Sequence, residues 1–408
     1  MNDLLKRLNL ENISDEFDEA YKKALKEPEM PIWLTEEFVR DTSDEFSFLP
    51  TRLDDVLTAL PEVRKNKDLV LFAKTLYHML GTRKHHEEVF GGLAFPVAPH
   101  AENPLAYDMF SFFPIFARIR EAYFSLRERG VDEEILRNTA SGLDVNITAC
   151  ENRVGRLSFT TTYFLWATTH ANASLFRIGR FNFEVRENCD LKIRAFINNK
   201  GMIKILMKEG ISIHKSGFVS GSAGNTDEDG SFITSYYETE NYYEGNEAVN
   251  ETCLVEREKT KLSKNEWNLL YAPGDNLISM HIPGHGMFSP ELLDKSLKDG
   301  IDFFKKLYPE NHFKAFMCIS WLLAPELKEL LKPESNIINF QNRYSKFPVL
   351  CEGLDVFPFV FEKSVSCLDD VDLDSLPCDS SLRRNLIALY KSGNFVHESG
   401  GIFPFAKA

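Results

Sequence analysis

The feature that most constrains the fold is a glycine-rich segment at residues 281–289, with the sequence HIPGHGMFS. An apolar run typical of a strand precedes it at residues 276–282, and a periodic apolar pattern typical of a helix follows from Ser289. A glycine turn that leads into a helix exposes backbone N–H groups and the positive end of the helix dipole. The segment therefore predicts an anion site, and phosphate is the usual anion of such sites.

The elements around this segment are well specified. Ser289 is a suitable N-cap, and Pro290 suits the first position of a helix because it lacks an N–H there. Pro309 ends the helical pattern, and residues 313–321 (FKAFMCISW) then read as a strand that is apolar on both faces, which is typical of a central strand. The loop therefore lies at the carboxyl end of the first strand, where open α/β sheets bind ligands.

The rest of the chain divides into a helical part and a part rich in strand patterns. Apolar steps of three and four predict helices at residues 53–60, 67–80, 105–129, 132–149 and 161–170. Alternating or β-branched residues predict strands at residues 181–185, 191–197 and 202–207, with a candidate pair at 211–219 and 232–237. The pattern changes near Leu175. We expect a helical domain over residues 1–173, one central sheet within residues 174–363, and a C-terminal extension with a short helix over residues 364–408.

Composition and charge exclude several classes of protein. The 408 residues, 43% of them hydrophobic, suffice for two domains with a core each. The net charge of −14 argues against general nucleic-acid binding. The seven scattered cysteines show no metal-ligand spacing, which predicts free thiols of a reducing cytosol and no metal site. Because no apolar segment has the length of a signal peptide or membrane span, we expect a cytoplasmic protein without a membrane partner.

Residues 281–286 have the form H-x-x-G-x-G. This form resembles the Q/R-x-x-G-x-G/A motif of the GNAT superfamily of acyl-CoA-dependent N-acyltransferases, with His281 in place of Gln or Arg. In that superfamily the motif lies between the fourth strand and the third helix, and its N–H groups hold the pyrophosphate of coenzyme A. The resemblance thus implies that the segment binds the pyrophosphate of coenzyme A.

Longer segments resemble one group of two-domain acyltransferases, in which a helical domain precedes a GNAT-like domain. These segments are LRERGVDEEIL (126–136), LFRIGRFNFEV (175–185), SWLLAPELKELLKPESNIINFQNRY (320–344) and DVFPFVFEK (355–363). The last two follow the order of the last helix and last strands of the fold. The resemblance covers much of residues 61–363, and it implies an α+β or α/β domain with a mixed central sheet flanked by helices.

The resemblance also implies a co-substrate, acyl-CoA with an acetyl or longer acyl group, whose pantetheine lies between diverging central strands. The backbone N–H near Ile282 would polarise the thioester carbonyl. For His285, contact with a phosphate and simple exposure to solvent are both open, and Trp321 is expected either to pack against a helix or to line the acyl channel. The residues implied to contact the co-substrate are Ile282, Gly284, His285, Gly286, Met287, Phe288, Ser289 and Trp321.

Three residues are candidates for proton transfer. A lysine-like amine has a pKa of about 10.4, so the acceptor ammonium must lose a proton before it attacks. His281 is the first candidate base and Glu184 the second, although His281 also fits a buried structural role or a phosphate contact. Many GNAT enzymes protonate the leaving thiolate with a tyrosine in the helix after the fifth strand. Residues 325–331 (PELKELL) have none, so Tyr344, after a strand expected at residues 337–340, is the candidate acid.

The acceptor implied by the resemblance is the amine of a small molecule or peptide, and the helical domain would set its specificity. The alternative is a GNAT-like protein without catalytic groups, acting as a sensor of acyl-CoA or nucleotide or as an interaction module. The replaced first position of the motif and the absent tyrosine are what such a protein would show.

Overall fold

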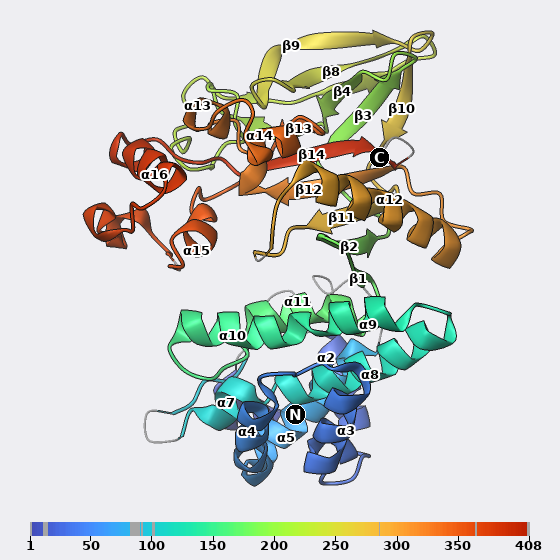
Figure 1. Ribbon diagram of the computed structural model, residues 1–408, viewed down its shortest axis with the longest axis vertical. Helices are drawn as coiled ribbons and strands as arrows, with labels where there is room; N and C mark the ends of the chain where they lie inside the picture. Colours follow the sequence, from blue (N-terminus) through green and yellow to red (C-terminus); the bar gives the residue numbers. More distant parts are fainter. Residues whose placement is uncertain are drawn as a thin grey trace. The chain divides into compact units, whose positions relative to one another are not determined.

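The computed structural model describes residues 2–10, 15–81, 90, 93–99, 103–284, 286–363 and 365–405. The chain divides into two compact units, Met1–Ile178 and Gly179–Ala408. Figure 1 shows helices throughout the first unit and strands with flanking helices in the second. Within the described ranges, no helix has both the length and the apolar character needed to cross a bilayer.

The first unit is built from helices around an aromatic core. Its helices are α1 (Asn2–Arg7), α2 (Asp15–Ala24), α3 (Glu36–Phe46), α4 (Leu53–Lys65), α5 (Lys67–Leu80), α7 (Leu105–Met109), α8 (Phe112–Glu128), α9 (Glu133–Ala140), α10 (Gly142–Val154) and α11 (Thr161–Ala171), with a 3₁₀ helix η1 (Ile32–Leu34). Thr35 and Asn66 cap α3 and α5 through their side chains. Phe46, Phe48 and Tyr123 pack ring against ring in the core. The expectation of a helical N-terminal region is confirmed.

A mixed six-stranded sheet forms the centre of the second unit. Its strands, in order across the sheet, are β1 (Leu175–Ile178), which is the last segment of the first unit, and then β2 (Phe181–Arg186), β11 (Leu277–His281), β12 (Ala315–Ser320), β14 (Ser399–Pro404) and β13 (Ser345–Pro348). β11 and β12 are parallel, and the pairs β2–β11, β12–β14 and β13–β14 are antiparallel. Helix α12 (Pro290–Leu307) packs on one face, where the rings of Phe183 and Phe304 lie 5.9 Å apart. The predicted mixed sheet flanked by helices is confirmed.

The prediction of one sheet for all strands was wrong. A second sheet has the order β10 (Trp267–Tyr271), β3 (Ile193–Asn198), β4 (Ile203–Met207), β8 (Tyr242–Val249) and β7 (Tyr236–Glu238), with β9 (Leu254–Ser263) also paired to β8. The short strands β5 (Ser212–Ile213) and β6 (Phe232–Ile233) form the predicted antiparallel pair. The two sheets share a hydrophobic core, in which Ile193 and Ile205 of one meet Leu277 and Met317 of the other. The second sheet therefore covers the face of the central sheet opposite α12.

Two predicted strands near the C-terminus are helices. The remaining helical elements are η2 (Trp321–Leu323), α13 (Leu327–Leu330), α14 (Asn336–Gln341), α15 (Val356–Val360), η3 (Leu368–Asp370), η4 (Leu373–Ser375) and α16 (Ser381–Lys391). α14 replaces the strand expected at residues 337–340, because Ser335 caps the segment by accepting from the N–H of Ile338. α15 lies where the resemblance implied a late strand.

The assignment of residues 364–408 to a separate extension also needs correction. α16 confirms the short helix, but β14 is an inner strand of the central sheet, between β12 and β13. All six residues of β14 are buried. The apolar terminus therefore completes the sheet, and the segment from β13 to β14 cannot be separated from the domain.

Candidate active site

The central sheet opens between β11 and β12. These parallel strands pair at Ile278–Phe316 and Ser279–Met317, and their pairing ends there. β11 nevertheless continues to His281 and β12 to Ser320. The carboxyl ends of the two central strands therefore diverge, as the resemblance implied for the site of a pantetheine.

The glycine-rich loop connects β11 to α12 at this edge of the sheet. Gly286 has a φ of +102°, a backbone conformation that residues other than glycine rarely adopt. A Cβ built at Gly284 would meet no atom within 4 Å. Met287 is 76% exposed. Among the described residues, no backbone carbonyl accepts from the N–H groups of Met287, Phe288 or Ser289. The loop therefore presents N–H groups to solvent beside a helix N-terminus. His285 lies outside the described residues.

Ser289 begins α12 differently from the prediction. It occupies the N-cap position with extended backbone, but its side chain accepts no capping hydrogen bond. Pro290 occupies the start of the helix as expected. The first N–H groups of α12 thus lack the partner that a capping serine supplies. The N–H of Glu291 bonds instead to its own carboxylate.

Arg180, in the turn between β1 and β2, lies against this loop. Its Nε donates to the carbonyl oxygen of Met287 at 3.0 Å, and its guanidinium carbon lies 5.5 Å from the ring centre of Phe288. Phe288 in turn packs against Phe340 of α14 at 5.2 Å. Although only 8% of Arg180 is exposed, its Nη1 has no hydrogen-bond partner among the described residues. A buried cation therefore lies beside the predicted anion site.

The two candidate bases, His281 and Glu184, form a pair. Nε2 of His281 lies 2.9 Å from Oε2 of Glu184, and the side chains are 32% and 6% exposed. The register explains the pairing, since Ser279 faces Glu184 and His281 faces Asn182 on the neighbouring strand. The two side chains are thus diagonal neighbours on one face. Arg186 donates to the other oxygen of Glu184 at 3.4 Å. A carboxylate so placed can fix the orientation of a histidine ring.

Tyr344 is buried on the α12 side of the same strands. Its hydroxyl donates to Sδ of Met280 at 3.6 Å, and the thiol of Cys318 is also a neighbour. Burial, with Cys318 as a further cause, raises the pKa of Tyr344 well above its ordinary value. Met280 belongs to β11 and Cys318 to β12, so the neutral hydroxyl lies against side chains of both strands on their α12 side.

Two other predicted residues lie at the margin of the site. Ile282 is half-buried directly after β11. Trp321 is half-buried in η2 and packs against a hydrophobic cluster that includes Leu327 of α13, Val356 of α15 and Leu386 of α16. This packing agrees with the structural role considered for Trp321, while its role in an acyl channel stays a prediction.

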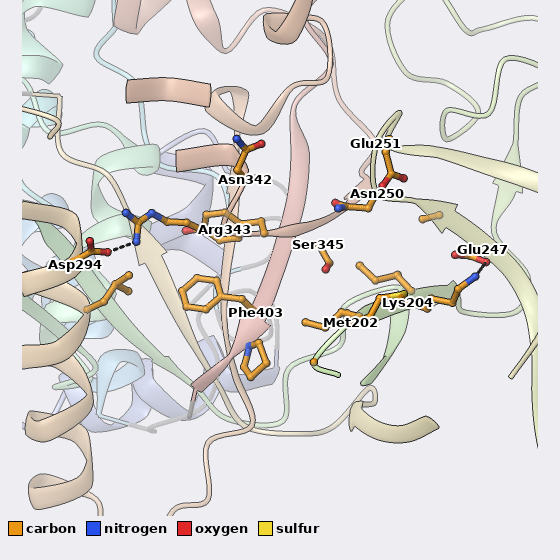
Figure 2. A pocket seen from close by; sticks show the side chains of 17 residues that line it. Met202, Lys204, Glu247, Asn250, Glu251, Asp294, Asn342, Arg343, Ser345 and Phe403 are labelled. Atoms are coloured by element: carbon orange, nitrogen blue, oxygen red, sulfur yellow. Dashed lines mark hydrogen bonds and ion pairs between the residues drawn. The ribbon is translucent and has the colours of Figure 1, made fainter. Parts of the chain in front are cut away.

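A cavity of about 670 Å³ lies between the edge of the central sheet and the second sheet. Figure 2 shows its polar walls: Arg343 points toward Asp294 and forms an ion pair with it, and Lys204 pairs with Glu247 at 2.8 Å. Tyr344 also lines the cavity, but His281 and Glu184 do not. Within the described part of the chain, no group of three or more His, Cys, Asp or Glu residues could hold a metal ion.

Two charged residues of the site were missed by the sequence analysis. Arg186 lies two residues from Glu184 in one strand, a spacing that places both side chains on the same face once the strand is accepted. Arg180 had no such signal, because 107 positions separate it from Met287. Only the packing of the β1–β2 turn against the loop brings them together.

Comparisons with known proteins agree with this geometry. No curated protein matches the chain. Among solved structures, an acyltransferase in complex with decanoyl-CoA and teicoplanin has a TM-score of 0.64 and 19% identity, covering 99% of both chains. A mutant acyltransferase in complex with octanoyl-CoA has a TM-score of 0.65 and 19% identity, covering 99% of this chain and 98% of the other. At this identity the likeness shows a shared fold. The family model described as the GNAT-like C-terminal domain matches residues 175–403, more than half of the chain, and the chain therefore belongs to that family.

Proposed function

We propose that this protein is an acyltransferase that moves an acyl group from acyl-CoA to an amine. The observation that carries the proposal is the His281–Glu184 pair, at the end of the strand that leads into the glycine-rich loop. A proton acceptor and an anion site thus share one end of the sheet, where β11 and β12 diverge. Transfer of an acyl group from acyl-CoA to an amine uses an anion site to hold the diphosphate and a proton acceptor to deprotonate the amine.

The loop from Gly284 to Ser289 is suited to the diphosphate of coenzyme A. The N–H groups of Met287, Phe288 and Ser289 and the N-terminus of α12 offer donors and a positive dipole end. The pantetheine would then run from the loop into the gap between β11 and β12, which brings the thioester near His281. Binding there would hold the two reactants in a fixed geometry, which lowers the entropic part of the barrier.

The proposed reaction is a direct transfer. His281, oriented by Glu184, takes a proton from the acceptor ammonium, and the freed amine attacks the thioester carbonyl carbon. A carbon–nitrogen bond forms while the carbon–sulfur bond breaks. Tyr344 gives its hydroxyl proton to the leaving thiolate and is reprotonated by the second proton that the nitrogen loses as the amide forms, while His281 releases the first proton to solvent. The backbone N–H near Ile282 would stabilise the oxyanion.

The substrates are proposed from the solved relatives. Those acyltransferases are in complex with decanoyl-CoA or octanoyl-CoA, and one also with teicoplanin. We infer that this chain uses an acetyl or longer acyl group and an amine carried by a small molecule or peptide. The sensor alternative has less support, because the paired His281 and Glu184 are a proton-transfer arrangement that a sensor does not need.

The test is release of free thiol from acetyl-CoA, octanoyl-CoA and decanoyl-CoA, with and without a panel of amines and amine-bearing peptides. We expect thiol release that depends on an amine, accompanied by amide product of the matching mass. His281→Gln should lower turnover by roughly two to four orders of magnitude while CoA affinity stays within about twofold. CoA binding without turnover on any amine would favour the sensor, and the absence of both would favour an interaction module.

A further inference from the structure

The side chain of Arg180 is a buried charge without a counter-charge. Its residue is 8% exposed, and its Nη1 has no hydrogen-bond partner among the described residues. No ion pair within the described part of the chain includes Arg180, and burial lowers the pKa of its guanidinium without a carboxylate to oppose the shift. A buried cation in this state costs free energy unless something else neutralises it. Its position therefore needs an explanation other than stability.

The turn that carries Arg180 is fixed to the second turn of α12. Gly179 has a φ of +59°, and a Cβ there would lie 3.2 Å from Cβ of Ser296. The N–H of Phe181 donates to Oγ of Ser296 at 3.2 Å. The guanidinium is held in turn by the Met287 carbonyl and the ring of Phe288. Arg180 is thus pinned beside the loop and the N-terminus of the 18-residue helix α12.

The helix start already stabilises a negative charge. The carboxyl group of Glu291, in the first turn, has a pKa below its ordinary value because its own backbone N–H and the hydroxyl of Ser289 bond to it. The loop itself supplies no permanent cation, since residues 282–289 contain neither lysine nor arginine. His281, at the motif's first position, is engaged with Glu184. A doubly charged ligand at this loop therefore lacks a cation unless Arg180 provides it.

We propose that Arg180 is a ligand of the diphosphate, supplying from the β1–β2 turn the positive charge that the loop lacks. This inference rests on the proposed function. The guanidinium keeps Nε on Met287 and turns its unpartnered Nη1 to a phosphate oxygen, while the loop N–H groups bind the other oxygens. The cost of burying the cation in the free protein is recovered when the anion binds.

The experiment is calorimetric titration of four proteins: wild type, Arg180→Met, Arg180→Lys and the control Arg194→Met. Arg194, like Arg180, has its guanidinium near an aromatic ring, that of Tyr236, but it is more exposed and is paired with Glu209. The ligands are CoA, dephospho-CoA and pantetheine. We expect Arg180→Met to lower the affinity for CoA and for dephospho-CoA equally, by roughly 10- to 100-fold, and to leave the affinity for pantetheine unchanged. Arg180→Lys should lose less, and Arg194→Met should match wild type.

The melting temperature of the free protein separates this role from a structural one. We expect Arg180→Met to melt at or above the temperature of wild type, because an uncompensated buried charge is removed. A lower melting temperature with equal weakening of CoA and pantetheine would overturn the inference, since Arg180 would then only tether the loop. A lower affinity for CoA with unchanged affinity for dephospho-CoA would also overturn the inference, because Arg180 would then contact the 3′-phosphate and not the diphosphate.

A further titration with inorganic pyrophosphate keeps the inference distinct from the proposed function. If wild type does not bind CoA but binds pyrophosphate in a way that Arg180→Met abolishes, the proposed function fails and the anion site with Arg180 stands. If wild type binds CoA and all Arg180 variants bind it equally, the proposed function stands and Arg180 is not a ligand. Binding of neither CoA nor pyrophosphate overturns both.

Discussion

At the scale of single residues, the most informative position is His281, where the motif of the superfamily carries Gln or Arg. The imidazole lies 2.9 Å from the carboxylate of Glu184, which stands 97 positions earlier in the chain on the neighbouring strand. Both residues could be proposed from the sequence as separate candidates. Their pairing could not, because it depends on the register of β2 against β11.

Glu184→Gln tests whether the carboxylate orients His281. The amide keeps the size of the side chain but removes its charge, so we expect turnover to fall by roughly 10- to 100-fold, with CoA affinity unchanged. The measurement is steady-state thiol release at saturating acyl-CoA. Turnover equal to that of wild type would show that the charge of Glu184 is not needed for the function of His281.

Tyr344→Phe tests the proposed acid. The hydroxyl contacts a thioether and a thiol, both weak partners, so its loss should change the free energy of unfolding by less than about 1 kcal/mol and lower turnover at least tenfold. Tyr390→Phe is the matched control: this buried hydroxyl donates to the Gly353 carbonyl at 2.6 Å, within the hydrophobic cluster of α15 and α16. The control should lose stability and keep turnover. If Tyr344→Phe instead lost stability and kept its turnover, Tyr344 would have no role in the reaction.

Lys346 of β13 predicts a pH-dependent stability. It is 1% exposed, its Nζ has no hydrogen-bond partner among the described residues, and burial together with nearby Lys328 lowers its pKa to about 8. The unfolded chain holds this proton more tightly than the folded chain. The charge therefore destabilises the fold fully below pH 8, and the penalty shrinks as the pH rises toward 10.5.

Lys346→Met should therefore raise the free energy of unfolding at pH 7 by about 1–3 kcal/mol. The gain should be clearly smaller at pH 9.5, where the folded protein has already released the proton. Urea unfolding of wild type and Lys346→Met at the two pH values measures the difference in the free energy of unfolding. An equal gain at both would mean that packing, and not the charge, sets the difference.

At the scale of elements, local signals were reliable and non-local pairing was not. The strand, glycine loop, helix and strand of residues 277–320 follow from local residues, because Pro290 and the apolar face of α12 act within the segment. The second sheet could not be predicted, since its strands alternate much as those of the central sheet do. The inner position of β14 was also missed, because an apolar terminus of six residues does not reveal its neighbours.

The inner position of β14 predicts a sensitive glycine. A Cβ at Gly401 would lie 2.7 Å from Cδ1 of Tyr344 and 2.9 Å from Cδ1 of Leu323. Gly401→Ala should therefore displace the tyrosine ring, lower the free energy of unfolding by about 1–3 kcal/mol and reduce turnover. Gly284→Ala is the steric control, because its Cβ would meet nothing within 4 Å, and its stability should match wild type. A fully stable Gly401→Ala would show that the strand can shift to make room.

At the scale of the whole molecule, a protein with a net charge of −14 is proposed to bind a polyanionic co-substrate. The overall field opposes that binding, so the attraction must be local. The loop N–H groups, the start of α12 and Arg180 concentrate positive potential at one end of the sheet. The glycine-rich segment and the helix after it predicted an anion site, but not the cation proposed to complete it.

The loop from Gly284 to Ser289 is proposed to hold the diphosphate of coenzyme A. Calorimetric titration of wild type and Gly286→Val with CoA is the decisive measurement. Because Gly286 has a φ of +102°, valine should distort the loop and turn its N–H groups away, while the helical unit stays folded. We predict one CoA bound per wild-type chain and no measurable binding by the variant. Equal affinity in the two proteins, or no binding to wild type, would contradict the account.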